Sequence, residues 1–198
     1  MYLKSSRYEE IKKSVSELIE DYNVTTLPID VFELAKAMKI DVKFRSDIPE
    51  NIHNDLNYMS YSNQTPAAVI YNEKQNKLVT LIDDLSNSFN KQRFSLAHEI
   101  AHICLSHIEQ SDKNEYEADY FAHELLIPTS LLCDMEENLV SHSILSYIFA
   151  VSEETADIAI RYRNNRKTIS QTFQYEEVIK GHLRDSLIEN LKEIKKGC

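Results

Sequence analysis

The sequence predicts an α+β fold that is mostly helical, with a small antiparallel sheet in its first half and an amphipathic helix at its C-terminal end. The 198 residues include only two glycines and four prolines, so helix-breaking residues are rare. Apolar residues recur at helical spacing over most of the chain and follow strand spacing only between residues 40 and 82. The hydrophobic content of 42% is enough for one domain with a sizeable core.

The first part of the chain is expected to combine helices with the strands of the sheet. Helical periodicity predicts helices at 6–22 and 28–39, the second opened by Pro28. Alternating apolar residues predict strands at 40–44, 55–61 and 67–71, the last two as a hairpin. Residues 78–82 fit either another strand or the entry of a helix.

The second part is expected to be entirely helical. A long helix at 84–108 starts from a cap at Asp83 or Asp84, and Ser111 caps the next helix. The predicted helices after residue 110 are 112–127, 129–135, 142–150, one that follows Ser152, and 175–195. The composition turns polar after Asn165, so we assign residues 1–168 to one domain and residues 169–198 to a helical extension.

Composition and charge exclude several classes of function. The net charge of −10 argues against nucleic-acid binding as the main role. Two glycines cannot build a glycine-rich phosphate loop. No apolar run approaches the ~20 residues of a membrane span, and no signal peptide is apparent. The three cysteines are widely spaced, which fits free thiols and a cytoplasmic location.

The segment RFSLAHEIAH at residues 93–102 contains the pattern HExxH. Residues four apart lie on one face of a helix, so His98 and His102 can direct both imidazoles at one metal ion. Glu99 lies about 100° round the helix from His98, beside the metal, where it can act as a general base. The flanking residues are almost all apolar, which predicts a buried helix.

A catalytic zinc site needs a third protein ligand. The extended form HExxHxxGxxH is excluded because Leu105 and Ile108 stand where it requires Gly and His. The following helix offers Glu115 and Glu117, about 160° apart by helix phase, so both cannot point at one ion. We choose Glu117 because it lies on the predicted buried face, and we expect Asp119 to hold a histidine N–H.

Together with the segment EYEADYFAHELLIP at residues 115–128, the HExxH segment resembles the ImmA/IrrE family of zinc metallo-endopeptidases. The resemblance covers roughly residues 8–165 and implies a zincin-like domain with one Zn²⁺ ion. It implies His98, His102 and Glu117 as the metal ligands and Glu99 as the catalytic base. It further implies a cytoplasmic protease that cleaves a helix-turn-helix repressor and so derepresses mobile-element, phage or stress genes.

A donor to the oxyanion is also expected. The sequence leaves four candidates open, which are Arg93, Tyr58, Tyr61 and His142.

Two other functions are compatible with the sequence. The first is a catalytically weak module of the same fold that binds and sequesters a repressor without cleaving it. The second is a DNA-binding role for residues 142–167, based on the basic run Arg161, Arg163, Arg166 and Lys167. The acidic balance makes direct nucleic-acid binding the least favoured of the three functions, and a charge run alone is typical of a solvated helix end.

Overall fold

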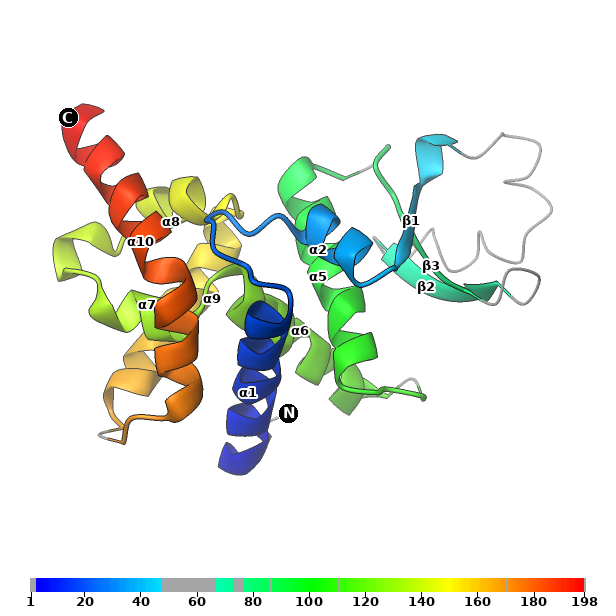
Figure 1. Ribbon diagram of the computed structural model, residues 1–198, viewed down its shortest axis with the longest axis horizontal. Helices are drawn as coiled ribbons and strands as arrows, with labels where there is room; N and C mark the ends of the chain where they lie inside the picture. Colours follow the sequence, from blue (N-terminus) through cyan, green and yellow to red (C-terminus); the bar gives the residue numbers. More distant parts are fainter. Residues whose placement is uncertain are drawn as a thin grey trace.

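A computed structural model of the chain describes residues 3–47, 67–72, 77–85, 87–109, 111–169 and 171–197. The structure is mostly helical and contains one small sheet, so the α+β prediction is confirmed. Figure 1 shows the sheet at one end of the molecule and α7 to α10 at the other, with α5 and α6 between them. None of the helices in these ranges combines the length and the apolar character needed to cross a bilayer.

The sheet is mixed rather than antiparallel, which corrects the prediction. Its strands are β1 (Asp41–Phe44), β2 (Ala67–Asn72) and β3 (Lys77–Ile82), in the order β1-β3-β2. β2 pairs with β3 antiparallel, whereas β1 pairs with β3 parallel. The parallel pair is possible because β1 and β3 are not consecutive strands: β2 lies between them in the sequence. The strand expected at 55–61, with its hairpin, lies outside the described residues.

The helices before the C-terminal third are α1 (Ser5–Asp21), α2 (Val31–Ala37), α5 (Phe89–Cys104) and α6 (Asp112–Leu126). Helix α5 begins five residues later than predicted, because Ser88 is its cap and its side chain accepts from the Lys91 N–H. Asp84 instead accepts from the backbone and the hydroxyl of Ser46. This contact joins the end of β3 to the turn after β1. The caps predicted at Ser111 and Ser152 are confirmed.

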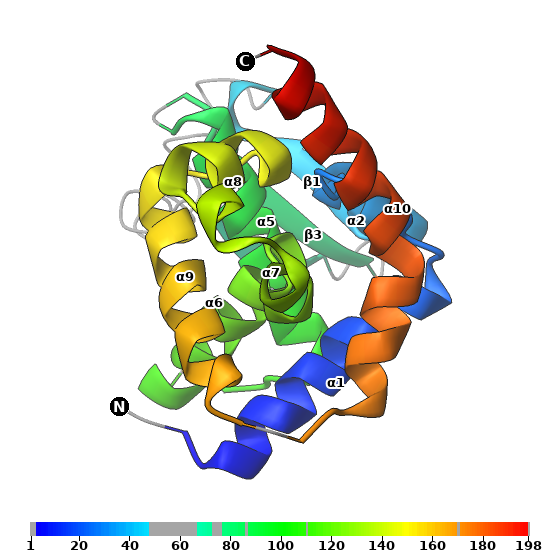
Figure 2. The ribbon, with the colours of Figure 1, turned by 90° about the vertical axis from the view of Figure 1, so that its left-hand side faces the viewer.

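The remaining helices are α7 (Thr129–Asp134), α8 (His142–Phe149), α9 (Glu153–Lys167) and α10 (Gln174–Gly197). Helix α10 lies along α1, as Figures 1 and 2 both show. Its Ile179, Leu183 and Leu187 are buried in the same core as Ile11 and Val15 of α1. The helix beyond residue 168 therefore packs into the core that the preceding residues form.

Helices α5 and α6 pack against each other at the centre of this core. Leu96 and Ile100 of α5 are fully buried, as are Phe121 and Leu125 of α6. Burying each such side chain contributes roughly 1.5–3 kcal/mol. The apolar positions around the HExxH motif therefore fix the rotation of α5 and turn the motif's polar face toward the start of α6.

Candidate metal centre

Three ligand atoms from α5 and α6 converge on one point. His98 Nε2 and His102 Nε2 are 3.0 Å apart. Glu115 reaches the pair from the first turn of α6, with one oxygen 3.2 Å from His98 Nε2 and the other 3.7 Å from His102 Nε2. A single donor atom from each residue lies within 4.8 Å of the other two.

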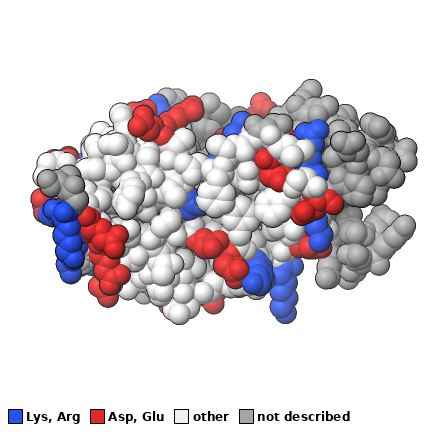
Figure 3. Space-filling view, turned by 90° about the horizontal axis from the view of Figure 1, so that it is seen from above, with Lys and Arg blue, Asp and Glu red and all other residues white. Residues whose placement is uncertain are grey.

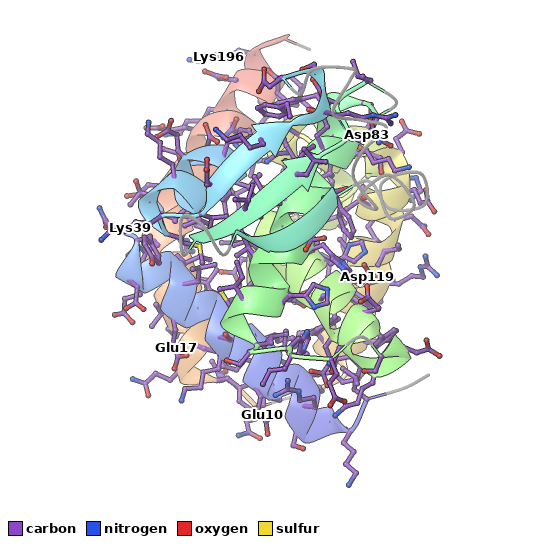
Figure 4. All side chains as sticks on the ribbon, turned by 90° about the vertical axis from the view of Figure 1, so that its right-hand side faces the viewer. Glu10, Glu17, Lys39, Asp83, Asp119 and Lys196 are labelled. Carbon is purple, nitrogen blue, oxygen red and sulfur yellow. The ribbon has the colours of Figure 1, made fainter. Side chains whose placement is uncertain are left out.

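Hydrogen bonds, burial and neighbouring charges set the protonation of the two histidines differently. Asp119 Oδ1 lies 2.8 Å from His98 Nδ1, so this nitrogen donates to the carboxylate and the Nε2 lone pair is left for an ion. Figure 4 views the molecule from the side on which the sheet lies and marks Asp119 of α6. Burial, with the charge on His98, lowers the pKa of His102 to about 4, which keeps this imidazole unprotonated near pH 7. Burial also opposes the charged form of His98, but the hydrogen bond to Asp119 and nearby carboxylates outweigh it and raise its pKa.

The arrangement fits a tetrahedral divalent ion. Two nitrogens that bind Zn²⁺ at about 2.0–2.1 Å lie about 3.3 Å apart. The observed separation of 3.0 Å between the two Nε2 atoms is close to that value. Two imidazoles and one carboxylate are also the ligand set of known catalytic zinc sites that keep one position open.

The third carboxylate at this point is Glu115 and not Glu117, which corrects the choice made from the sequence. The Glu117 side chain is 1% exposed and turns to the other side of His102, where it contacts Arg7 and His107. Helix phase was right that only one of the two can face the ion. The choice made from the sequence assumed that the ligand sits on the buried face, whereas Glu115 is on the exposed rim of the site.

A signal for Glu115 was present in the sequence. Asp119 contacts His98 directly, and a ligand from the same helix must share the face of Asp119. Glu115 is four residues before Asp119 and lies on that face, whereas Glu117 is two residues away and points elsewhere. Pairing the expected ligand with its expected outer partner would have selected Glu115.

Comparison with known proteins places this centre in a family. A model of the IrrE N-terminal-like domain, Peptidase M78, matches residues 51–161, more than half of the chain. The chain belongs to this family. The resemblance found in the sequence is thereby confirmed, and the chain is a metallopeptidase-like IrrE/ImmA domain whose matched region contains both α5 and α6. A search of curated proteins finds no match.

Glu99 occupies the position after His98 on α5 and is half-buried. Two of the four candidates for the oxyanion donor have other partners in this IrrE-like domain. The Arg93 guanidinium is 3% exposed and donates to backbone carbonyls of Ile29, Phe149 and Ala150. His142 Nε2 lies 3.3 Å from Asp157. The other two, Tyr58 and Tyr61, lie outside the described residues.

The basic run at the end of α9 is engaged in ion pairs. Arg163 is 2% exposed and is held by the carbonyls of Leu132 and Met135 and by Glu137. The remaining pairs are Arg161 with Asp157, Arg166 with Glu176, and Lys167 with Glu137. Arg163 is thus a core residue and not part of a solvated helix end.

In the face shown in Figure 3, the described residues likewise carry acidic and basic groups in small separate patches. Among the described residues on this face, the basic groups form no extended positive patch.

Two further histidines have roles that the sequence did not indicate. The His107 side chain is 6% exposed and its Nδ1 lies 3.0 Å from His102 Nδ1, although a position at a helix end had suggested only an interaction with the helix dipole. His123 stands between Phe94 and Tyr162, and burial lowers its pKa to about 4. The chain bends after α5, where Ser106 has a φ of 54°, and this bend brings His107 beside His102. The pattern of apolar residues along a helix does not reveal such a bend.

Proposed function

We propose that this protein is a zinc-dependent endopeptidase in which His98, His102 and Glu115 hold the ion and Glu99 is the general base. The observation that carries the proposal is the convergence of one donor atom from each of the three ligand residues, within 4.8 Å of one another. The peptidase family match over the same helices supports the reaction class. Imidazole and carboxylate ligands suit zinc, although other divalent ions accept the same donors.

A bound zinc ion would supply Lewis-acid polarisation of the scissile carbonyl and a water whose pKa is lowered to about 7. The chain's own residues supply the proton transfers. Glu99 lies one residue beyond His98, which by helix geometry is about 100° round α5, and its charge acts on His98. There its carboxylate takes a proton from the attacking water and delivers it to the nitrogen of the leaving amine. Asp119 keeps the His98 ring in one orientation through the hydrogen bond at Nδ1.

We further propose that the substrate is a helix-turn-helix repressor in the cytoplasm, and that its cleavage derepresses the genes it controls. The resemblance to ImmA/IrrE proteases supports this substrate class. The net charge of −10 also complements the basic surface that a DNA-binding substrate presents. The described cysteines, Cys104 and Cys133, are free, which is compatible with a reducing compartment.

Substitution of Glu99 by Gln tests the assignment. The zinc-loaded wild-type protein is incubated with candidate helix-turn-helix repressors from the same genome, and cleavage is followed by mass spectrometry. Glu99→Gln keeps the shape of the side chain but removes the base, so we expect the rate to fall about 10²–10⁴-fold with zinc still bound. Glu109→Gln, at an exposed carboxylate between α5 and α6, is the control and should cleave normally.

Two outcomes would contradict the proposal. Cleavage by Glu99→Gln at the wild-type rate would show that another group is the base. If the wild-type protein binds the repressor without cutting it, and Glu99→Gln relieves repression in cells equally well, the protein acts by sequestration and not as a protease.

A further inference from the structure

The side of His102 that faces away from the converging ligand atoms is hydrogen-bonded as well. Its Nδ1 lies 3.0 Å from His107 Nδ1, and His107 Nε2 lies 3.3 Å from a carboxylate oxygen of Glu117. The exposed fraction is 6% for the His107 side chain and 1% for that of Glu117. Two buried side chains, His107 and Glu117, therefore extend the hydrogen bonds of His102 away from the other candidate ligands.

Only one assignment of protons satisfies this line when His102 binds an ion. Binding through Nε2 requires the proton of a neutral His102 to be on Nδ1, which then donates to His107 Nδ1. His107 must accept at Nδ1, so its own proton is on Nε2 and donates to Glu117. Each hydrogen bond is thus donated in the direction away from the metal, and the final acceptor is the Glu117 carboxylate.

The same logic already holds for the other histidine, whose Nδ1 donates directly to Asp119. Histidines that bind metals usually donate their second ring nitrogen to a carboxylate or carbonyl, which fixes the ring and strengthens its basicity. We propose that Glu117 and His107 are positioning residues that orient His102 on the metal, with Arg7 of α1 holding the Glu117 carboxylate. This inference rests on the proposed metal centre.

Arg7 explains how a carboxylate can remain ionised at such a buried place. Its guanidinium donates to Glu117, and Lys113 Nζ lies 3.5 Å from the second oxygen. An unpaired carboxylate so deeply buried would be strongly disfavoured. Helix α1 packs on α6 and lies outside the segment that matches the family model, so a residue from outside that segment completes this side of the site.

A purely structural ion pair between α1 and α6 would not account for His107. Arg7 and Glu117 could join the two helices without an imidazole between Glu117 and His102. Arg7 also pairs with Glu10, whose side chain is 60% exposed and which lies on the same helix, marked in Figure 4. The pair Arg7–Glu10 leads away from His102, which makes Glu10 a matched control for Glu117.

Zinc affinity of the full-length protein, measured by competition with a chromophoric chelator, tests the proposal. We expect Glu117→Gln and His107→Phe to weaken zinc binding roughly 10–100-fold. Arg7→Met should also weaken zinc binding, because the Glu117 carboxylate loses the group that holds it. Glu10→Gln should bind zinc as the wild type does. The visible spectrum of the Co²⁺-substituted protein should keep the intensity of a four-coordinate site in Glu117→Gln, because no direct ligand is lost. Measurements are made well below each variant's melting temperature.

Unchanged zinc affinity in Glu117→Gln and His107→Phe would overturn the proposal and leave an ion pair that only joins helices. A Co²⁺ spectrum in Glu117→Gln that shows a lost ligand would overturn it in the other direction, because Glu117 would then bind the metal itself. If the wild-type protein binds no zinc, the metal centre fails along with the proposed function. The two failures can be told apart. If the metal centre is absent, the wild type binds no zinc; if only the positioning role is wrong, the wild type and the variants bind zinc equally well.

Discussion

Replacing Arg93 by methionine should destabilise the fold strongly, because this side chain joins three parts of the chain. From α5 its guanidinium donates to the Ile29 carbonyl before α2, at 2.7 Å, and to the Phe149 carbonyl at the end of α8, at 2.9 Å. A third bond goes to the Ala150 carbonyl. Methionine fills much of the volume of the arginine stem but donates to none of these oxygens.

The expected loss of stability follows from the three abandoned carbonyls. A buried acceptor left without its donor costs about 1–3 kcal/mol, and three of them together cost about 3–9 kcal/mol. A domain of this kind has a total stability of roughly 5–15 kcal/mol, so the variant should remain folded only marginally. With a urea m-value of about 2–3 kcal/mol/M, the unfolding midpoint should fall by at least about 1 M.

Urea unfolding followed by circular dichroism measures this shift. Lys91→Met is the matched control, since Lys91 is exposed on the same helix, and it should stay within about 0.5 kcal/mol of the wild type. Arg93→Lys should recover only part of the loss, because an ammonium cannot reproduce the planar fork of donors. A midpoint shift of Arg93→Met below about 0.4 M would refute the reasoning and reopen Arg93 as a group available for catalysis.

Two further predictions concern stability. Burial raises the pKa of Glu176, but hydrogen bonds from Arg166 and the Phe173 N–H outweigh it, so the folded pKa is lowered. Its stabilisation is complete above the unfolded pKa of about 4.3 and is lost as pH falls through the folded pKa. Glu176→Gln should therefore be less stable than the wild type at pH 7 in urea titrations, with a difference that shrinks below about pH 4; a constant difference would contradict this. Ser88→Ala should lower the unfolding free energy by about 0.5–2 kcal/mol through loss of the α5 cap, and no change in thermal unfolding would place the helix start elsewhere.

Local patterns in the sequence were sufficient for most helices. The caps at Ser111 and Ser152 and the apolar period of each helix depend on neighbouring residues only. The HExxH spacing likewise brings His98 and His102 together through the geometry of one helix. The predicted start of α5 was wrong because Asp84 had an equally good local signal as a cap, and a distant contact with Ser46 uses that side chain instead.

Features that depend on distant segments were not accessible in this way. The parallel pairing of β1 with β3 joins residues about 38 positions apart, and alternation along one strand does not specify its neighbour. The choice between Glu115 and Glu117 also depends on how α6 is rotated against α5, and in the sequence only the spacing between Glu115 and Asp119 pointed to it. The Arg7–Glu117–His107 line joins α1, α6 and the loop after α5, so no single motif contains it. The sequence predicted Arg163 to be a surface charge. Its buried partners include backbone carbonyls, and a sequence does not show which carbonyls will lack a hydrogen-bond donor.

The proposed function rests on one metal ion held between α5 and α6 of the IrrE-like domain by His98, His102 and Glu115. A crystal structure of the zinc-loaded protein, with anomalous difference maps on both sides of the zinc absorption edge, tests it most directly. We expect one strong peak about 2.0–2.2 Å from His98 Nε2, His102 Nε2 and a Glu115 oxygen. The Glu117 carboxylate should still contact Arg7 and His107 and not the metal. A zinc ion bound by Glu117, or a peak away from the two histidines, would contradict it.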